Sequence, residues 1–164
     1  MIERTRDVLE ACRANELTIA TAESCTGGLL AGCLTEIAGS SDVFERGFVT
    51  YSDRAKTEML SVPAPLIEKL GAVSEEVARA MAQGALARSA ADLSLAVTGI
   101  AGPDGATEAK PVGLVHIACA RREAGVLHER HVFSGNRETV RLATLETALG
   151  LLKRRAEESS ARGS

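Results

Sequence analysis

The sequence predicts a single three-layer α/β/α domain with a mixed sheet of about five strands. Apolar runs of strand length alternate with segments whose apolar residues recur at helical spacing, a pattern typical of helices that flank a sheet. The chain has 164 residues, which is enough to bury a sizeable core in one domain. Hydrophobic residues make up 45% of it, but there is one Tyr, three Phe and no Trp, so the core must be aliphatic.

The first third of the chain predicts two helices and two strands. Residues 2–14 carry apolar side chains at helical spacing, and 16–22 has the apolar character of a buried strand. The segment 27–39 follows a glycine pair and predicts a helix closed by Gly39. Residues 44–52 are rich in aromatic and β-branched side chains, which indicates a strand.

The middle of the chain is predicted to be helical. Residues 53–60 form a short helix with Asp53 as its N-cap, and 61–71, which contains two prolines, gives a further short helical turn. The strongest helix signal covers 73–90, where Ser74 is the N-cap and two glutamates follow in the first turn. The apolar side chains expected on the buried face of this helix are Val77, Met81, Ala85 and Leu86.

The last third supplies the remaining strands. Residues 92–100 are almost continuously apolar, as in a strand covered on both faces, and 101–111 is a loop rich in turn residues. The strands 112–120 and 126–133 are separated by only five residues, which suits a hairpin and therefore a mixed sheet. A final helix covers 137–156.

Composition sets the expected boundaries, compartment and partners. The domain is expected to cover residues 1–157, followed by a polar, disordered tail at 158–164. A formal net charge of −3 and an isoelectric point near 5.7 argue against a nucleic-acid partner. The start of the chain is charged and lacks a signal-peptide pattern, and no apolar run approaches membrane-spanning length. We therefore expect a cytoplasmic protein without a membrane partner.

Three glycine- or hydroxyl-rich junctions follow predicted strands: AESCTGG (22–28), TYSDRAK (50–56) and TGIAGPDG (98–105). Open α/β sheets bind ligands in the loops at strand ends, so these segments are the candidate site. None of them is a P-loop, a nucleophile elbow or the G-x-G-x-x-G dinucleotide fingerprint. The four cysteines show no metal-ligand spacing, and we expect neither a metal nor a cofactor.

Ser24 is the first candidate nucleophile, although Ser24 or Thr26 could simply cap the following helix. Cys25 is a second candidate, because helix N-termini lower the pKa of a thiol. The three histidines fall in the late hairpin and do not predict a Ser-His-Asp triad. A base could instead be Lys56, if burial lowers its pKa, with Tyr51 as a relay; the alternative is an ordinary solvated lysine.

Long segments of the chain resemble the CinA carboxy-terminal domain family. The resemblance covers roughly residues 5–155 and is carried by 21–56, 71–105 and KPVGLVHIA (110–118). Stand-alone members of that family are nicotinamide-nucleotide amidohydrolases, which convert nicotinamide mononucleotide to nicotinic acid mononucleotide and ammonia in pyridine nucleotide recycling. Many members carry an additional amino-terminal domain that looks like a molybdopterin-binding module. We expect this chain to lack it, and functions attached to it are not carried over.

The resemblance also implies roles for particular residues. The family's catalytic serine falls on Ser24, and its lysine and tyrosine fall on Lys56 and Tyr51. Backbone N–H groups of residues 25–27 would stabilise the oxyanion. The remaining residues expected to bind the substrate are Thr26, Gly27, Gly28, Thr98, Gly99, Ile100, Ala101 and Gly102. Arg137 and Arg141 are candidate phosphate partners by charge and position, or else part of a solvated helix face.

Two other functions stay open at this point. The chain could be a non-catalytic nucleotide-binding or regulatory module of the CinA type, which would keep the glycines but tolerate the loss of Lys56. A DNA-associated competence factor is suggested by the family's name alone and is opposed by the acidic isoelectric point. We further expect a homo-oligomer, a dimer or higher.

Overall fold

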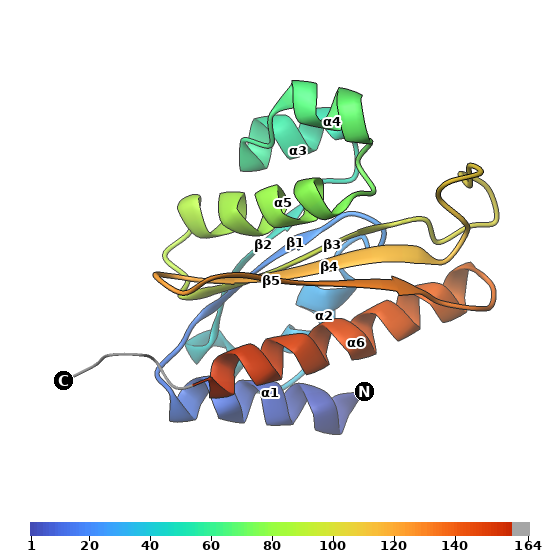
Figure 1. Ribbon diagram of the computed structural model, residues 1–164. Helices are drawn as coiled ribbons and strands as arrows, with labels where there is room; N and C mark the ends of the chain where they lie inside the picture. Colours follow the sequence, from blue (N-terminus) through green and yellow to red (C-terminus); the bar gives the residue numbers. More distant parts are fainter. Residues whose placement is uncertain (159–164) are drawn as a thin grey trace.

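A five-stranded sheet forms the middle layer of the fold, and helices cover both of its faces (Figure 1). The structure, a computed structural model, describes residues 1–158, so 159–164 of the predicted tail lie outside the described residues. The strands of the described part are β1 (Ile19–Glu23), β2 (Phe44–Val49), β3 (Leu93–Gly99), β4 (Leu114–Arg121) and β5 (Gly125–Val132). Its helices are α1 (Ile2–Ala14), α2 (Leu29–Thr35), the short 3₁₀ helix η1 (Ser40–Asp42), α3 (Asp53–Leu60), α4 (Ala64–Leu70), α5 (Glu75–Ala87) and α6 (Arg137–Glu157). The predicted three-layer α/β/α fold is confirmed.

The sheet is mixed, as predicted, with the strand order β2-β1-β3-β4-β5. β1 runs parallel to β2 and β3, whereas β3, β4 and β5 pair antiparallel. The connection from β1 to β2 contains α2 on one face of the sheet. The connection from β2 to β3 contains α3, α4 and α5 on the other face (Figure 1). The strand order therefore reverses at the carboxyl end of β1, the position where open α/β sheets leave a crevice.

Alternating side chains divide the hydrophobic core into two halves. On β3 and β4, Leu95 and Ile117 pack with α1, α2 and α6, while Ala96 and Ala118 face α5. This follows from the two-residue period of a strand. Small alanine side chains on the second face let α5 lie close to the sheet, with α3 and α4 stacked outside it.

Helix α5 matches its prediction closely. Ser74 is the N-cap, and its hydroxyl accepts a hydrogen bond from the Val77 N–H at 3.3 Å. The four side chains expected on its inner face, Val77, Met81, Ala85 and Leu86, are all buried.

The helix predicted over 27–39 is wrong at both ends, because α2 is only seven residues long. Gly27 and Gly28 have φ values of +56° and +104°, left-handed conformations that a right-handed helix cannot include. At the other end α2 stops at Thr35, whose hydroxyl donates back to the carbonyls of Ala31 and Gly32, a side-chain bonding that weakens a helix slightly. Gly39 instead precedes η1.

Two smaller boundaries also differ from the prediction. The N-cap of α3 is Ser52, whose hydroxyl accepts from the Ala55 N–H at 3.0 Å, and Asp53 is the first helical residue. The segment predicted as a helical turn contains the regular helix α4. Its prolines stand at Pro63 and Pro65, before and within the first turn, where a helix has no use for the missing N–H groups.

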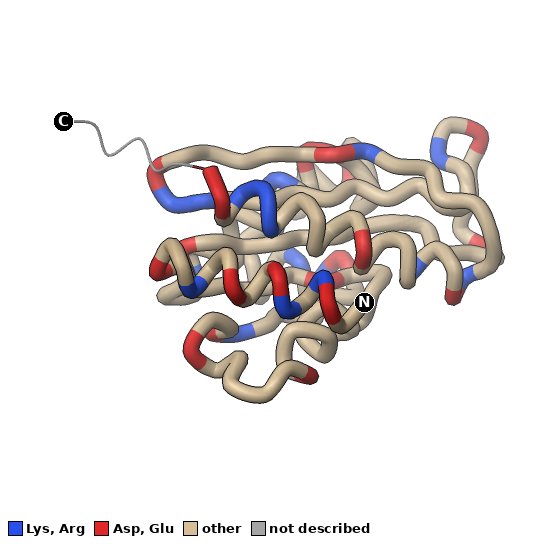
Figure 2. The backbone as a smooth tube through the Cα atoms, turned by 90° about the horizontal axis from the view of Figure 1, so that it is seen from below, with Lys and Arg blue, Asp and Glu red and all other residues tan. Residues whose placement is uncertain are grey.

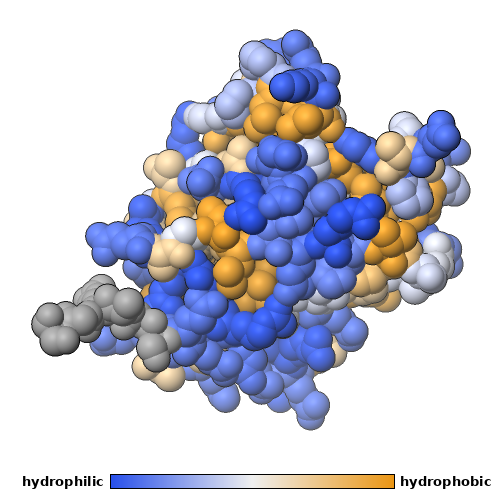
Figure 3. All heavy atoms as spheres, in the orientation of Figure 1, coloured by the Kyte–Doolittle hydropathy of each residue, from blue (hydrophilic) through white to orange (hydrophobic). Residues whose placement is uncertain are grey.

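The surface carries mixed charge and separate apolar patches. On the face formed by α1 and α6, residues of both signs alternate (Figure 2). Figure 3 shows hydrophobic residues in patches separated by hydrophilic ones on the face turned to the viewer. Among the helices of residues 1–158, none is both long enough and apolar enough to cross a membrane.

The close approach of α5 to α3 gives a test of the packing. A Cβ at Gly84 would lie 2.0 Å from the backbone oxygen of Leu60, so Gly84→Ala must push the two helices apart. We expect a loss of roughly 1–3 kcal/mol in the free energy of unfolding, measured with urea. Gly150→Ala in α6 is the matched control, because its Cβ would meet only the ends of two flexible side chains, Arg154 at 3.8 Å and Arg4 at 4.0 Å. That change should stabilise the helix by up to about 1 kcal/mol; equal effects at the two positions would contradict the packing argument.

Candidate active site

Ser24 lies at the reversal of strand order, directly after the last residue of β1. Its N–H donates to the carbonyl of Val97 on β3 at 3.1 Å, which fixes the residue to the neighbouring strand. The side chain of Lys56 reaches this point from α3, which covers the opposite face from α2. Both are buried: Ser24 is 8% exposed and Lys56 only 1%. Two residues 32 positions apart in the chain are thus brought together by the crossover from β2.

The Lys56 amine and the Ser24 hydroxyl are in hydrogen-bond contact, with 3.0 Å between Nζ and Oγ. Nζ also lies 2.9 Å from the Thr50 carbonyl oxygen and 3.4 Å from that of Tyr51. An ammonium group would donate to all three oxygens. A neutral amine would donate to the two carbonyls and turn its lone pair to the serine O–H. The same heavy-atom geometry therefore serves both protonation states.

Burial lowers the pKa of Lys56, while the charge of Asp53 and, to a lesser degree, Cys25 oppose this shift. A lysine in such a site can lose its proton near neutral pH more readily than one in water. The interpretation of Lys56 as a solvated lysine is wrong, because its amine is enclosed and faces a hydroxyl.

Cys25 is not activated as the position before a helix suggested. Burial raises the pKa of its thiol to about 11. The lowering expected at a helix N-terminus fails because α2 begins only at Leu29, four residues later. The N–H groups of Leu30 and Ala31 at that terminus already donate to the Glu23 carboxylate. Ser24 is consequently the better-placed nucleophile.

A cavity of about 210 Å³ opens over the serine and the lysine. It is lined by Ser24, Cys25, Tyr51, Asp53, Lys56, Ala72, Val73, Thr98, Gly99, Ala101 and Arg137. Three of these, Asp53, Ala72 and Val73, were missed as site residues. Asp53 belongs to the candidate junction 50–56, but its position predicted only a helix cap. Ala72 and Val73 lie before α5 in a segment that carries no pattern typical of a ligand site.

Other predicted substrate contacts lie outside this lining: Thr26, Gly27, Gly28, Ile100, Gly102 and Arg141. Gly102 is linked to the cavity through Arg137, which lines it and donates a hydrogen bond to the Gly102 carbonyl at 3.0 Å. Gly99 lines the cavity, but a Cβ there would lie 2.8 Å from the Leu114 carbonyl oxygen. Close strand packing is thus a sufficient reason for that glycine.

The two arginines of α6 have different surroundings. Arg137 donates to the Gly102 carbonyl and, at 3.1 Å, to the Tyr51 hydroxyl, and it lines the cavity. Arg141 donates to the carbonyls of Cys25 and Thr26 at 3.1 and 3.2 Å, so it holds the backbone of the loop. Arg137 is therefore the better placed of the two to meet an anionic ligand in the cavity.

Tyr51 approaches Lys56 through its backbone rather than its hydroxyl. Its carbonyl accepts from Nζ, whereas the hydroxyl is paired with Arg137 and the side chain is 61% exposed. The predicted relay through this hydroxyl would require it to leave Arg137.

The loop 24–28 offers fewer oxyanion donors than expected. The Gly27 N–H donates to the Ser24 carbonyl at 3.0 Å and is occupied. Among residues 1–158, the N–H groups of Cys25 and Thr26 have no backbone acceptor, so these two remain as candidate oxyanion donors. 

The histidines lie apart from the serine. His116 and His128 are hydrogen-bonded to each other at 2.9 Å between β4 and β5, and burial lowers the pKa of His116 to about 4. His131 pairs with Glu129. None of them lines the cavity over Ser24, and in the described part of the chain no three His, Cys, Asp or Glu side chains gather as a metal site.

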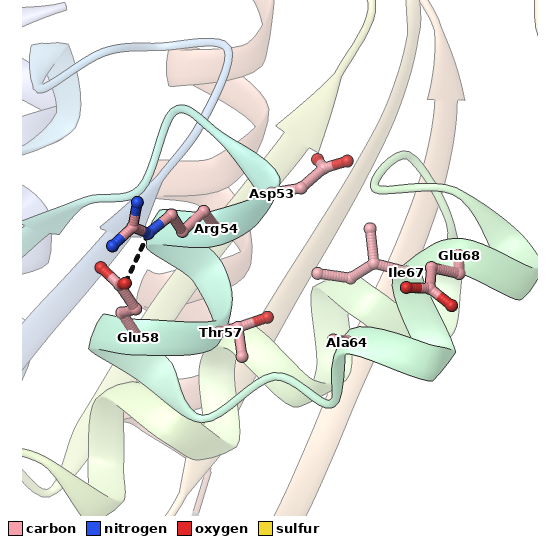
Figure 4. Close-up of a pocket in the computed structure, with 7 residues that line it drawn as sticks. All are labelled: Asp53, Arg54, Thr57, Glu58, Ala64, Ile67 and Glu68. Carbon is pink, nitrogen blue, oxygen red and sulfur yellow. Dashed lines mark hydrogen bonds and ion pairs between the residues drawn. The ribbon is translucent and has the colours of Figure 1, made fainter.

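A larger cavity of about 440 Å³ lies on the other side of Asp53, between α3 and α4 (Figure 4). Figure 4 shows Arg54 and Glu58 joined as an ion pair on its wall, with the Asp53 carboxylate directed away from them. Ile67 and Ala64 supply its apolar surface. Its lining holds no nucleophile in hydrogen-bond contact with a base, so the smaller cavity is the candidate active site.

The family model of the CinA C-terminal domain matches residues 2–156, nearly all of the described chain. The chain belongs to the CinA C-terminal domain family. The solved structure of the competence/damage inducible protein CihA from Agrobacterium tumefaciens is 51% identical and has a TM-score of 0.89, with 92% of each chain covered. The competence damage-inducible protein A (ComA) from Klebsiella pneumoniae is 37% identical, with a TM-score of 0.92 and coverage of 96% of this chain and 98% of that one.

Curated relatives of this CinA domain are longer. A CinA-like protein from Citrifermentans bemidjiense is 56% identical over 142 residues, which are 87% of this chain and 34% of that protein. The chain thus spans about a third of the length of the curated relatives it matches.

The stability of the protein should carry a signature of the buried Lys56 amine. Its pKa is lower in the folded state than the ordinary value of 10.5, so between these two values unfolding takes up a proton. Stability therefore rises with pH across this window and levels off above it. The difference in unfolding free energy between wild type and Lys56→Met should move in favour of wild type over the same range.

Urea unfolding at a series of pH values measures this difference. Lys69→Met, on the exposed side of α4, is the control for removal of a lysine in general. A Lys56→Met difference as flat in pH as that of the control would show that the amine is not perturbed.

Proposed function

We propose that this CinA domain is a serine amidase that hydrolyses the carboxamide of nicotinamide mononucleotide to nicotinic acid mononucleotide and ammonia. The observation that supports this most directly is the 3.0 Å contact between Lys56 Nζ and Ser24 Oγ in a buried site that opens into a cavity. A serine hydroxyl is a poor nucleophile without a base, and the contact supplies one. The arginine at the edge of the same cavity supplies a partner for a phosphate.

The reaction would run in two halves. Ser24 Oγ attacks the amide carbon as the neutral Lys56 amine takes its proton, and the oxyanion forms beside the N–H groups of Cys25 and Thr26. The C–N bond then breaks, and Lys56 returns the proton to the leaving nitrogen, which departs as ammonia. In the second half Lys56 deprotonates a water that attacks the acyl ester. The carboxylate is released and Ser24 Oγ regains its proton.

Two polar groups at the edge of the cavity would complete the site. Arg137 would bind the phosphate of the substrate, since a guanidinium makes strong, directional hydrogen bonds to phosphate oxygens. The Tyr51 hydroxyl, which Arg137 now holds, would be free to assist proton transfer to ammonia if the phosphate took its place. The binding energy of the remote phosphate would then help to position the amide over Ser24.

A non-catalytic nucleotide-binding module is the competing hypothesis. Such a module needs the cavity and a cation, but it has no use for a buried amine aimed at a hydroxyl. Enclosing an amine costs free energy, because the charged form is poorly solvated there. Release of ammonia from nicotinamide mononucleotide by the purified protein separates the two hypotheses. Binding of the mononucleotide without ammonia release would favour the module.

Variants of the serine and the lysine test the mechanism. Ser24→Ala removes the oxygen that forms the acyl-enzyme, and we expect turnover to fall by at least about 10³-fold. Lys56→Arg should be nearly as inactive, because a guanidinium stays protonated at any usable pH. Ammonia release is the measurement, and the unfolding midpoint of each variant checks the fold. A folded Ser24→Ala protein with near-normal turnover, or an active Lys56→Arg protein, would remove the respective residue from the mechanism.

Substrates with and without the phosphate test Arg137. Arg137→Gln should lower kcat/KM for the mononucleotide by about 10- to 100-fold, the loss of one charge-assisted contact. The rate on nicotinamide riboside, which lacks the phosphate, should be low in wild type and little changed by the substitution. Arg54→Gln, at the other cavity, is the matched control. If kcat/KM fell equally for both substrates, Arg137 would support the loop at Gly102 rather than bind the phosphate.

A further inference from the structure

Glu23, the last residue of β1, has a fully buried carboxylate to which the reaction above gives no role. Its Oε1 accepts a hydrogen bond from the Leu30 N–H at 2.8 Å, and its Oε2 accepts one from the Ala31 N–H at 3.1 Å. It does not line the cavity over Ser24, so it is not placed to touch the substrate. A carboxylate is costly to bury, and these two bonds are what satisfies it.

The bonds replace a helix cap that the sequence does not provide. The N-cap position of α2 is Gly28, which has no side chain to accept from the first N–H groups of the helix. Glu23 reaches across from the preceding strand and closes residues 24–28 into a loop whose two ends it joins. Ser24 stands at one end of this loop, immediately after the glutamate.

The backbone of the same residue extends to the lysine. The Glu23 carbonyl accepts from the Thr50 N–H at 2.8 Å, and the Thr50 carbonyl in turn accepts from Lys56 Nζ at 2.9 Å. The side chain of Glu23 thus holds the loop of the nucleophile, and its main chain holds the segment to which the base is bonded. Glu23 is therefore hydrogen-bonded to the segments on both sides of the Ser24–Lys56 pair.

We infer that Glu23 is a positioning residue, which sets the distance between the Ser24 hydroxyl and the Lys56 amine by tying the loop 24–28 to the end of β1. This inference rests on the proposed serine amidase function. A misplacement of about 1 Å at a reacting group can reduce the rate by about 10²-fold. Because Glu23 lies behind the loop and away from the cavity, its loss affects the chemical step more than substrate binding.

Glu23→Gln tests the inference with almost no change in shape. The amide keeps one acceptor oxygen but turns an NH₂ group toward the second backbone N–H, so one of the two bonds is lost. We expect kcat on nicotinamide mononucleotide to fall by about 10- to 100-fold, with KM within about threefold of wild type. Glu36→Gln, an exposed glutamate at the other end of α2, is the matched control and should leave both constants unchanged. Rates are expressed per folded molecule, from circular dichroism.

A stabilising role alone predicts a different result. In that case the unfolding midpoint of Glu23→Gln falls while kcat per folded molecule stays at the wild-type value, and this outcome overturns the inference. If Glu23 acted instead through its negative charge on Lys56, the pH profile of kcat would shift in Glu23→Gln, and this outcome would also overturn the inference. We expect the profile to keep the same midpoint, with a lower maximal kcat. Glu23→Asp, whose carboxylate reaches at most one N–H group, should show the same loss and serves if Glu23→Gln fails to fold.

A second measurement is independent of the proposed reaction. Cys25 lies within the loop that Glu23 closes, and because its thiol is buried we expect it to react slowly. Alkylation of Cys25 by iodoacetamide can be followed by mass spectrometry. We expect it to be at least about fivefold faster in Glu23→Gln than in wild type, because a loop with fewer hydrogen bonds opens more often and exposes the thiol. If wild type releases no ammonia, the proposed function fails and this rate alone decides whether Glu23 holds the loop. An unchanged rate overturns the inference.

Discussion

The hydrogen bond between the Lys56 amine and the Ser24 hydroxyl depends on the reversal of strand order at the carboxyl end of β1. Because β1 lies between two parallel neighbours, the helices that follow β1 and β2 must cover opposite faces of the sheet. The segment after β1 therefore meets the segment after β2 at one edge, with a crevice between them. A serine from the first segment and a lysine from the second are enclosed there together, away from most of the solvent.

Charged side chains around this crevice mostly support the backbone. Glu23 accepts from the Leu30 and Ala31 N–H groups in the first turn of α2, and Arg141 donates to two carbonyls of the same loop. The glycines have comparable roles: Gly27 and Gly28 turn the chain through left-handed conformations, and Gly99 lets β4 approach. A glycine-rich segment at a strand end is thus explained here largely by geometry, and only part of it faces the cavity.

The distribution of charge suits a small anionic ligand better than a polymer. Arg137 lines a cavity of about 210 Å³, whereas the backbone positions coloured in Figure 2 mix both signs and the chain carries a formal net charge of −3. Nucleic-acid binding depends on a continuous basic surface. One curated relative, from Caldicellulosiruptor bescii, has a name that refers to competence-damage induction, and about two thirds of its length lies beyond the region matched by this chain. Arg137 on the wall of this cavity supports the proposed small anionic ligand.

The sequence by itself determined the layers of the fold, because burial period and turn residues are local signals: the apolar run of β3 and the capped helix α5 were predictable from neighbouring residues. It also singled out Ser24 and Lys56, partly through family resemblance. It did not determine where α2 begins, since that depends on left-handed glycines and on a glutamate that bonds across the loop. Only the tertiary structure showed that burial raises the pKa of the Cys25 thiol, that Arg137 and not Arg141 lines the cavity, and that Lys56 is buried rather than solvated. Each of these features depends on solvent exclusion and on contacts between residues distant in the chain, which no local pattern encodes.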